Sequence, residues 1–312
     1  MNETNSTGTD TPITEMVLWY WSARAAVAIL TVLGNGLVMY LIIRNRKLRV
    51  IPNAFIFALA LADFLVGVIV TPTDFACTFW YPKAGSCNPR KLRLLFDILI
   101  HLSVTNLCSL TFDRYMAVVR PLKYHNFMRR GRVVIILAIT WLSAAVFPSI
   151  GYICLSYNME LTGKILRVVD MTFLQILPPV LLAIAYMRMV CIARQHEKTV
   201  RLQHSQLTFN YGNRSQKSKN RSKQGDSRER ASVKMIGAVI VAFFLCYTLA
   251  IFRSLLIYIM DKHLPLTVVY ASRILLLLNS AINFVVYAFL KKDIKKEFQR
   301  MCKLKRKGST NV

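Results

Sequence analysis

Asp113 and Arg114 are the adjacent acid and base whose position in this sequence most directly suggests chemistry. They stand near the end of a long apolar segment, Leu94–Val119, which also contains Asp97. An ionisable group beside hydrocarbon is costly and tends to be functional, and an arginine keeps its charge at every accessible pH. Arg114 therefore needs a partner at the edge of this segment, and Asp113 is adjacent to it.

Asp63 is a second acid in apolar surroundings, near the middle of its segment. No cluster of metal ligands and no nucleophile–base pair stands at usable spacing elsewhere in the sequence. We therefore do not expect an enzyme, and we expect Asp63 and the Asp113–Arg114 pair to serve another function.

The segments that must position these residues are long and apolar. A run of about 18 or more apolar residues can cross the hydrocarbon of a bilayer as a helix, because lipid offers no partners for backbone N–H and C=O groups. Seven segments qualify, some with a charge or a proline pair: Ala25–Ile43, Pro52–Phe75, Leu94–Val119, Val133–Met159, Ile165–Ile192, Met235–Phe252 and Leu264–Leu290. The sequence predicts an all-α membrane protein, a seven-transmembrane helix bundle over residues 21–290.

The formal net charge of +26 could suggest nucleic-acid binding, but its distribution indicates a membrane topology instead. Of the 41 Lys and Arg residues, 28 lie in alternate connections and in the C-terminal tail. Such residues concentrate on the cytoplasmic side. We expect a multi-pass plasma-membrane protein with the N-terminus outside, the C-terminus inside and no nucleic-acid partner. Residues 1–20 would be an extracellular tail, glycosylated at Asn2 and Asn5.

Two polar segments lie on the predicted inner side. The connection at about 196–228 is rich in Ser, Gln, Asn, Lys and Arg, and we expect it to be largely disordered. In residues 291–312, Ile294 and Phe298 continue a four-residue repeat that begins at Leu290, with lysines between them. This pattern predicts an amphipathic helix on the inner leaflet. Cys302 in this helix is either palmitoylated or a plain thiol.

The string Asp113-Arg114-Tyr115-Met-Ala-Val-Val-Arg120-Pro121 closely resembles the signature that ends the third helix of rhodopsin-like G-protein-coupled receptors. Matching motifs stand in the other segments in the family's order: Gly34-Asn35 with Val38, Leu61-Ala62-Asp63, Trp141, Pro178 with Tyr186, Phe243-x-x-Cys246, and Asn279-Ser280-x-x-Asn283-x-x-x-Tyr287. The spacing agrees as well, since Trp141 follows Arg114 by 27 residues. The overall spacing of these motifs along the chain resembles that of the amine receptors best.

The resemblance implies an activation switch made of Asp113, Arg114, Tyr115, Tyr186, Glu229, Phe243, Tyr247, Asn283 and Tyr287. In this switch Glu229 would hold Arg114 at rest and release it when the sixth helix swings outward. The alternative is that Glu229 is a solvated residue at the start of that helix. The sequence departs from the family at Tyr247, where the family has tryptophan, and at Leu249 and Phe284, where it has prolines. The sixth helix therefore lacks its usual kink-forming residue.

The resemblance also implies an ion site and a disulfide. A sodium ion would bind at Asp63, Ser103, Asn279, Ser280 and Asn283, because carboxylate and hydroxyl oxygens suit a hard cation. The alternative is a protonated, hydrogen-bonded Asp63 without an ion, and no other cofactor is expected. Cys87 stands seven residues after Trp80, as in the family. We expect it to pair with Cys154, and Cys77–Cys87 is the rival pairing.

The sequence identifies the ligand less closely than it identifies the family. Leu277 stands where a light receptor needs a lysine, so we do not expect an opsin. An amine receptor needs an aspartate on the pocket face of the third segment, but five turns before Arg114 lies Phe96, with Asp97 rotated about 100° away. The candidate pocket residues are Asp74, Phe96, Asp97, Asp170, Tyr247, Arg253 and Arg273. Arg273 would either bind an anionic ligand or pair with Asp97 or Asp74.

We therefore predict a receptor that binds an extracellular amine, peptide, lipid or nucleoside and activates heterotrimeric G proteins. The alternative is a non-signalling membrane protein such as a transporter or channel. Charges along a path at mid-membrane and symmetry between two halves would support that alternative. However, Asp63 is the only charge near the middle of the predicted spans, and no repeat is evident.

Overall fold

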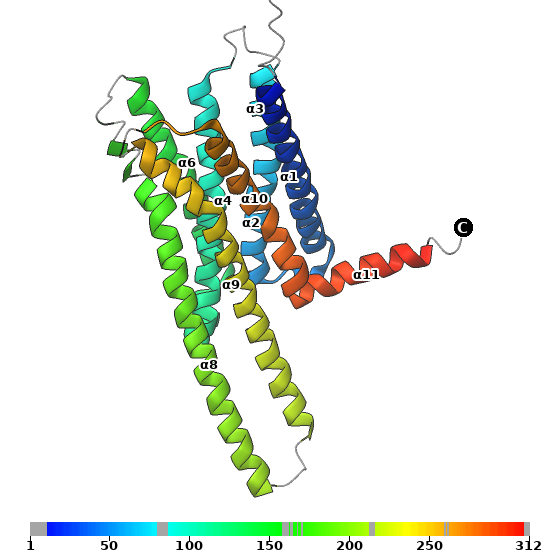
Figure 1. Cartoon of the computed structure of the whole chain (residues 1–312). Helices are drawn as coiled ribbons and strands as arrows, with labels where there is room; N and C mark the ends of the chain where they lie inside the picture. Colours follow the sequence, from blue (N-terminus) through cyan, green and yellow to red (C-terminus); the bar gives the residue numbers. More distant parts are fainter. Residues whose placement is uncertain are drawn as a thin grey trace, which may run out of the picture.

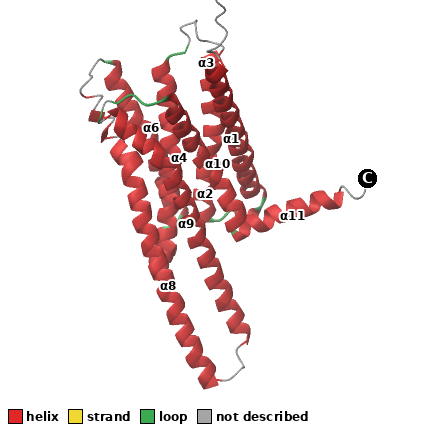
Figure 2. Ribbon diagram, viewed as in Figure 1, coloured by secondary structure: helices red, strands yellow, loops and turns green. Residues whose placement is uncertain are grey.

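The computed structural model describes residues 11–79, 87–157, 162, 165–166, 168–169, 171–211, 216–258, 260 and 262–308. These residues form helices joined by turns, and they contain no strand (Figure 2). In chain order the elements are α1 (Thr11–Arg44), η1 (Arg46–Leu48), α2 (Ile51–Leu65), η2 (Val66–Val70), α3 (Thr71–Phe79), α4 (Pro89–Val119), α5 (Pro121–Phe127), α6 (Arg130–Ser156), η3 (Met171–Ile176), α8 (Leu177–Tyr211), α9 (Gln216–Tyr258), α10 (Leu266–Leu290) and α11 (Lys292–Gly308). The short element η1 is a 3-10 helix, and η2 and η3 are π-helices.

Seven helical segments are long and apolar enough to cross a membrane: Val17–Arg44, Ile51–Phe79, Arg90–Val119, Arg130–Cys154, Leu177–His196, Val233–Ile257 and Leu266–Leu290. Figure 1 shows them packed side by side in one bundle. Large apolar side chains such as Leu33, Ile139 and Leu245 are exposed on its outside, where lipid tails are as apolar as they are. The predicted fold class is confirmed.

The two ends of the bundle carry different features. One end holds a disulfide between Cys77 and Cys87, and we call it the disulfide end. The opposite end holds Asp113 and Arg114, and we call it the Arg114 end. In Figure 1, α8 and α9 extend beyond the other helices at the Arg114 end, and α11 leaves the bundle to one side.

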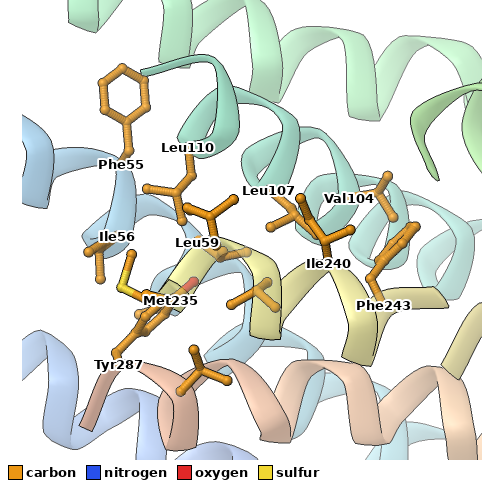
Figure 3. Packing of buried hydrophobic residues seen from close by; sticks show 14 of the residues in the cluster. Phe55, Ile56, Leu59, Val104, Leu107, Leu110, Met235, Ile240, Phe243 and Tyr287 are labelled. Carbon is orange, nitrogen blue, oxygen red and sulfur yellow. The ribbon is translucent and has the colours of Figure 1, made fainter. Parts of the chain in front are cut away.

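Side chains from four helices meet in one core between these ends (Figure 3). Leu59 of α2, Leu107 of α4, Phe243 of α9 and Tyr287 of α10 are all fully buried there. Because lipid is as apolar as these side chains, close packing rather than water exclusion holds the helices together. The core therefore fixes the relative positions of the helices that carry the predicted sites.

Two span boundaries differ most from the sequence prediction. The sequence predicts a first span from Ala25, but the membrane segment begins at Val17 and α1 already at Thr11, inside the predicted tail. The reason is that the buried Arg24 forms an ion pair with Asp74, so its charge does not end the span. The predicted fifth span begins at Ile165, whereas the observed one begins at Leu177, after η3.

The connection at 196–228 joins α8 to α9. Helix α8 continues to Tyr211 and α9 begins at Gln216. Residues 212–215 lie outside the described residues. Gln, Lys and Arg are good helix formers, so both transmembrane helices continue past their apolar segments. The disorder expected for this connection stays a prediction.

The amphipathic helix after the seventh span is confirmed as α11. Ile294 is buried, and Leu290 and Phe298 pack against the core. Lys295 and Lys296 on the other face are exposed. The side chain of Cys302 lies outside the described residues, so its palmitoylation stays a prediction.

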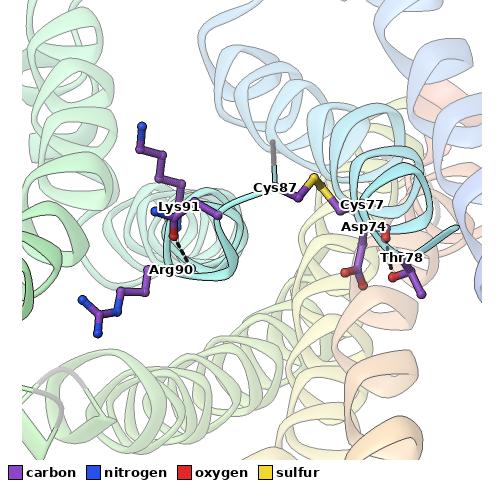
Figure 4. Close-up of a disulfide and its surroundings, with 7 residues drawn as sticks. Asp74, Cys77, Thr78, Cys87, Arg90 and Lys91 are labelled. Atoms are coloured by element: carbon purple, nitrogen blue, oxygen red, sulfur yellow. Dashed lines mark hydrogen bonds between the residues drawn. A yellow bond between two sulfur atoms is a disulfide. The ribbon is translucent and has the colours of Figure 1, made fainter. Parts of the chain in front are cut away.

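The expected Cys87–Cys154 disulfide is wrong, because Cys87 is bonded to Cys77 (Figure 4). The two Cα atoms are 5.6 Å apart, an ordinary separation for a disulfide. Helix α3 ends at Phe79, and the chain returns to α4 through Cys87 and Asn88, whose side chain caps α4 by accepting from the backbone N–H of Arg90. This return brings the two cysteines together, while Cys154 near the end of α6 is a free thiol.

Candidate functional site

Arg114 lies beside the acid predicted to be its partner. Its Nε is 3.3 Å from Oδ2 of Asp113, whose side chain is fully buried. The hydroxyl of Tyr124 on α5 donates to the other carboxylate oxygen of Asp113 over 2.8 Å. Burial raises the pKa of Tyr124, and the charge of Asp113 raises it further, so the phenol keeps the proton that it donates. Tyr124 thus fixes the acid that holds Arg114, a role that the sequence motif alone did not reveal.

The other residues of the predicted switch are partly described. The side chain of Glu229 lies outside the described residues, so its contact with Arg114 stays a prediction. Tyr186 of α8 lies against Gly237 of α9, where a Cβ atom would be only 2.3 Å from the tyrosine hydroxyl oxygen. The Tyr186 hydroxyl therefore lies directly against α9, and a larger residue at position 237 would displace it.

Asp63 is the centre of a buried polar cluster. Ser103 donates to its Oδ1 over 2.6 Å, and Asn283 donates to its Oδ2 over 2.8 Å. These contacts join α2, α4 and α10, because the three residues come from three different helices. Asn279 and Ser280 are also buried. The structure thus places all five predicted sodium-site residues in the bundle interior and brings three of them into direct contact.

The cluster fits a small hard cation. Three buried oxygens make no hydrogen bond among the described residues: Oδ1 of Asn279, Oγ of Ser280 and Oδ1 of Asn283. A buried acceptor without a partner is costly, and oxygen ligands of this kind suit a hard cation. Asp63 and these oxygens would hold the ion. Its positive charge would balance the negative charge of the Asp63 carboxylate.

Tyr247 lies in the bundle interior. Its ring stacks on Phe243, one turn earlier on α9, with the ring centroids 4.1 Å apart. Both side chains are buried, and the Tyr247 hydroxyl makes no hydrogen bond within the described part of the chain. Its place in the predicted switch stays a prediction, and Tyr247 does not line the cavity described next.

A cavity of about 600 Å³ opens at the disulfide end. Its wall contains Arg24, Val70, Asp74, Arg90, Leu92, Arg93, Leu95, Phe96, Asp97, Arg253, Ile257, Val269 and Arg273. Five predicted pocket residues, Asp74, Phe96, Asp97, Arg253 and Arg273, are therefore brought together. Asp170 lies outside the described residues.

Arg24 is a cavity residue that the sequence reasoning missed. Its side chain is 1% exposed and forms an ion pair with Asp74 and a hydrogen bond to the Tyr20 hydroxyl over 2.7 Å. Its guanidinium carbon lies 5.0 Å from the ring centroid of Trp21, within the range of a cation–π contact. An arginine just inside the end of an apolar run was the available signal, because such a charge must find a partner.

The other charged residues of the cavity wall come from three helices. On α4, Nε of Arg93 lies 3.8 Å from Oδ2 of Asp97. Arg253 of α9 donates to the Ser272 hydroxyl of α10 over 2.7 Å. Arg273 has no ion pair with a described residue, and Asp74 is bonded to Arg24. The proposed pairing of Arg273 with Asp97 or Asp74 is therefore not observed.

A family model described as "7 transmembrane receptor (rhodopsin family)" matches residues 34–287. The match covers most of the chain and extends from Gly34 to Tyr287, so it includes the Asp63 cluster and the Asp113–Arg114 pair. The chain belongs to the rhodopsin family of seven-transmembrane receptors. It is therefore a G-protein-coupled receptor, and the resemblance drawn from its motifs is confirmed.

Known relatives of this receptor carry the names of amine receptors. The octopamine receptor beta-2R of Chilo suppressalis is 27% identical over 88% of this chain and 76% of its own length. The human histamine H2 receptor is 27% identical over 91% of this chain and 80% of its own. The alpha-2B adrenergic receptor of Talpa europaea is 36% identical over a shorter stretch, 39% of this chain and 32% of its own. None of these similarities supports the transporter alternative.

Phe284 explains one departure of the receptor from the family pattern. Its ring lies against Gly34 of α1, where a Cβ atom would be 2.1 Å from Cδ1 of the ring. Next to this contact, Asn35 donates to the backbone carbonyl oxygen of Ser280 over 3.1 Å. The aromatic side chain in place of a proline therefore packs α10 closely onto α1.

Lys291 is a second residue at the Arg114 end that the sequence reasoning did not single out. It follows the last residue of α10, and its Nζ donates to Oδ1 of Asn53 at the start of α2. The pKa of Lys291 is lowered to about 7, mainly by burial and then by the charge of Arg114, against the opposing effect of Asp293 and Asp113. The lysine therefore ties the junction of α10 and α11 to α2.

Proposed function

We propose that this receptor binds a small-molecule ligand in the disulfide-end cavity and activates a heterotrimeric G protein from the Arg114 end. The observation that carries this proposal is that single helices join the two places. Helix α4 contributes Phe96 and Asp97 to the cavity and Arg114 to the opposite end. A ligand that moves the cavity end of a rigid, packed helix therefore changes the other end.

The disulfide end faces the outside of the plasma membrane in this proposal. A disulfide persists in an oxidising compartment, and the excess of Lys and Arg lies in the connections at the Arg114 end. The N-terminal tail, with its sequons at Asn2 and Asn5, is then extracellular. Helix α11 lies on the inner leaflet, where Cys302 is available for palmitoylation.

The path between the two ends runs through the buried polar cluster and the α9 stack. Asp63 joins α2, α4 and α10 through Ser103 and Asn283. Phe243 and Tyr247 lie in the same core on α9. Outward movement of α9 would change its packing on this core and would free Arg114, with Glu229 as the second acid that holds it at rest.

A biogenic amine is the second candidate for the ligand. The names of the relatives favour it, because they include receptors for octopamine and histamine. Asp97 lines the cavity and is the acid nearest in sequence to the position that an amine receptor requires. An amine bound there would have to share Asp97 with Arg93, which is 3.8 Å away.

Basal G-protein turnover tests the proposed signalling function without a known ligand. The receptor is expressed in membranes with purified heterotrimeric G proteins, and nucleotide exchange is compared with that of Arg114→Ala. We expect measurable exchange that Arg114→Ala abolishes and that Lys296→Ala, an exposed charge on α11, leaves unchanged. Well-folded receptor that gives no exchange with any G-protein class, or exchange that ignores Arg114→Ala, would contradict the proposal.

A further inference from the structure

The wall of the disulfide-end cavity is strongly basic. It contains five arginines, Arg24, Arg90, Arg93, Arg253 and Arg273, against two acids, Asp74 and Asp97. Among the described residues, the wall therefore has three more positive than negative formal charges. In a low-dielectric, membrane-embedded bundle, like charges that are not neutralised are strongly destabilising.

Both acids of this wall have arginine neighbours. Asp74 is in an ion pair with the buried Arg24. Asp97 lies 3.8 Å from Arg93, one turn earlier on α4. The excess positive charge therefore falls on Arg90 of α4 and on Arg253 and Arg273 of α9 and α10.

Arg253 and Arg273 form a pair of like charges. The guanidinium group of Arg253 is half-buried and is held by the Ser272 hydroxyl, a neutral group. Arg93, Arg253 and Arg273 all line the same cavity, with Asp97 as the acid beside Arg93. Arg273 is solvent-exposed and has no carboxylate partner within the described ranges. An anion placed between the two guanidinium groups would remove this repulsion.

The remaining wall of the cavity is apolar. It is formed by Val70, Leu92, Leu95, Phe96, Ile257 and Val269. A volume of about 600 Å³ lies within the range of small-molecule sites. The site thus offers two guanidinium groups, which bind carboxylates and phosphates with paired hydrogen bonds, beside a surface suited to a hydrocarbon or aromatic body.

We infer that the ligand of this receptor carries an anionic group, a carboxylate, phosphate or sulfate, on a small apolar body, and that Arg253 and Arg273 bind the anionic group. The inference rests on the proposed ligand cavity and names the class of ligand that the cavity takes. A ligand with a single positive charge would meet a wall that is already positive. This receptor would then differ in ligand class from the amine receptors that it resembles in sequence.

The test is a thermal-shift titration of the purified full-length receptor in a non-ionic detergent. The anionic probes are phenyl phosphate, phenyl sulfate and hexanoate, and the matched cations of similar body are phenethylamine and hexylamine. We expect at least one anion at about 10 mM to raise the Tm, because a ligand that binds the folded state stabilises it, while the two amines do not. The three anions separate phosphate, sulfate and carboxylate as the preferred group.

Two variants locate the effect. Arg273→Gln is expected to weaken the apparent affinity for the anion by about tenfold or more, since a charge-assisted hydrogen bond is worth about 1.5–3 kcal/mol. Arg253→Lys keeps a positive charge and should weaken it less. Arg300→Gln, an exposed cation on α11, is the control and should change nothing. Because Arg273 is exposed, its substitution should leave folding intact even where a change at Arg253 does not.

Three results would overturn the inference. They are no Tm rise with any of the anions, a rise that Arg273→Gln leaves unchanged, or a rise with the amines alone that Asp97→Asn removes. The Arg114-dependent nucleotide exchange is measured on the same preparation. A receptor that signals but ignores the anions keeps the proposed signalling function and loses only the anionic ligand.

Discussion

Phe284 occupies the space that Gly34 leaves by having no side chain. An added Cβ atom at Gly34 would meet three atoms of the phenyl ring at 2.1 to 2.4 Å. Helices α1 and α10 therefore approach each other at this point more closely than any other residue would permit, and the same neighbourhood holds the Asn35 hydrogen bond.

Gly34→Ala is expected to destabilise the receptor by about 1–3 kcal/mol, the usual effect of overpacking a filled interior. The loss should show as a lower Tm of the purified protein. Gly151→Ala is the control, because a Cβ atom there would meet nothing within 4 Å. Adding Phe284→Ala to Gly34→Ala should recover part of the loss. Equal Tm values for Gly34→Ala and Gly151→Ala would contradict the close packing of α1 and α10.

Gly237→Ala is expected to change signalling rather than stability alone. The new methyl group would displace the Tyr186 hydroxyl from α9, which loosens the contact of α8 with α9 and favours outward movement of α9. We expect basal nucleotide exchange to rise about fivefold, the effect of about 1 kcal/mol on a two-state balance. Gly131→Ala, which meets nothing within 4 Å, is the control. An unchanged or lower basal rate at normal expression would refute this role for the contact.

Arg24→Met should lower the free energy of unfolding by about 3 kcal/mol, because removal of one partner leaves the other charge of a buried pair uncompensated. Surface expression and Tm should both fall. The double variant Arg24→Met/Asp74→Leu should recover most of the loss, since it removes both charges together. If the double variant were no more stable than the single one, the ion pair would not be what holds Arg24 in the bundle.

Lys291 should give the receptor a pH-dependent stability. Its pKa in the folded state is lowered to about 7 by burial and by Arg114, from 10.5 when exposed. Between these values the unfolded state binds a proton that the folded state has lost, so stability should increase as the pH rises from about 7 to about 10, by at most about 1.4 kcal/mol per pH unit. Below about pH 7 this contribution is constant.

The difference in Tm between the receptor and Lys291→Met, measured from pH 6 to pH 9.5, isolates this effect from other titrating groups. The Tm of the unmodified receptor should rise relative to the Tm of Lys291→Met as the pH rises. Lys295→Met is the control, because Lys295 is exposed on α11. A difference that stays constant over this range would show that Lys291 keeps an ordinary pKa.

Sodium should stabilise the receptor specifically if the oxygens around Asp63 bind it. We expect a higher Tm in about 150 mM NaCl than in the same concentration of potassium or choline chloride, since a ligand that binds the folded state stabilises it. Asp63→Asn should abolish the difference because it removes the negative charge. A sodium effect that persists in Asp63→Asn would place the ion elsewhere, and no effect at all would favour the protonated carboxyl group.

The fold was predictable because its main determinant is local. A run of apolar residues must become a helix in lipid, whatever its neighbours are, and this rule identified the seven spans. The four-residue repeat after Leu290 identified the amphipathic helix. Local rules failed where a long-range contact changed the outcome. The predicted first span began after Arg24, although the ion pair of Arg24 with Asp74 keeps this residue inside the bundle. The disulfide partner of Cys87 depended on how α3 and α4 lie relative to each other.

The sequence by itself determined the number and type of the helices, the receptor family and the identity of Asp63, Asp113 and Arg114 as charges that need partners. These conclusions follow from hydrophobicity and spacing along the chain. Only the tertiary structure decided which groups meet them: Tyr124 on Asp113, Ser103 and Asn283 on Asp63, and Arg253 beside Arg273 in one cavity. Such contacts join residues far apart in the chain, and they depend on how whole helices rotate and pack, which no local pattern specifies.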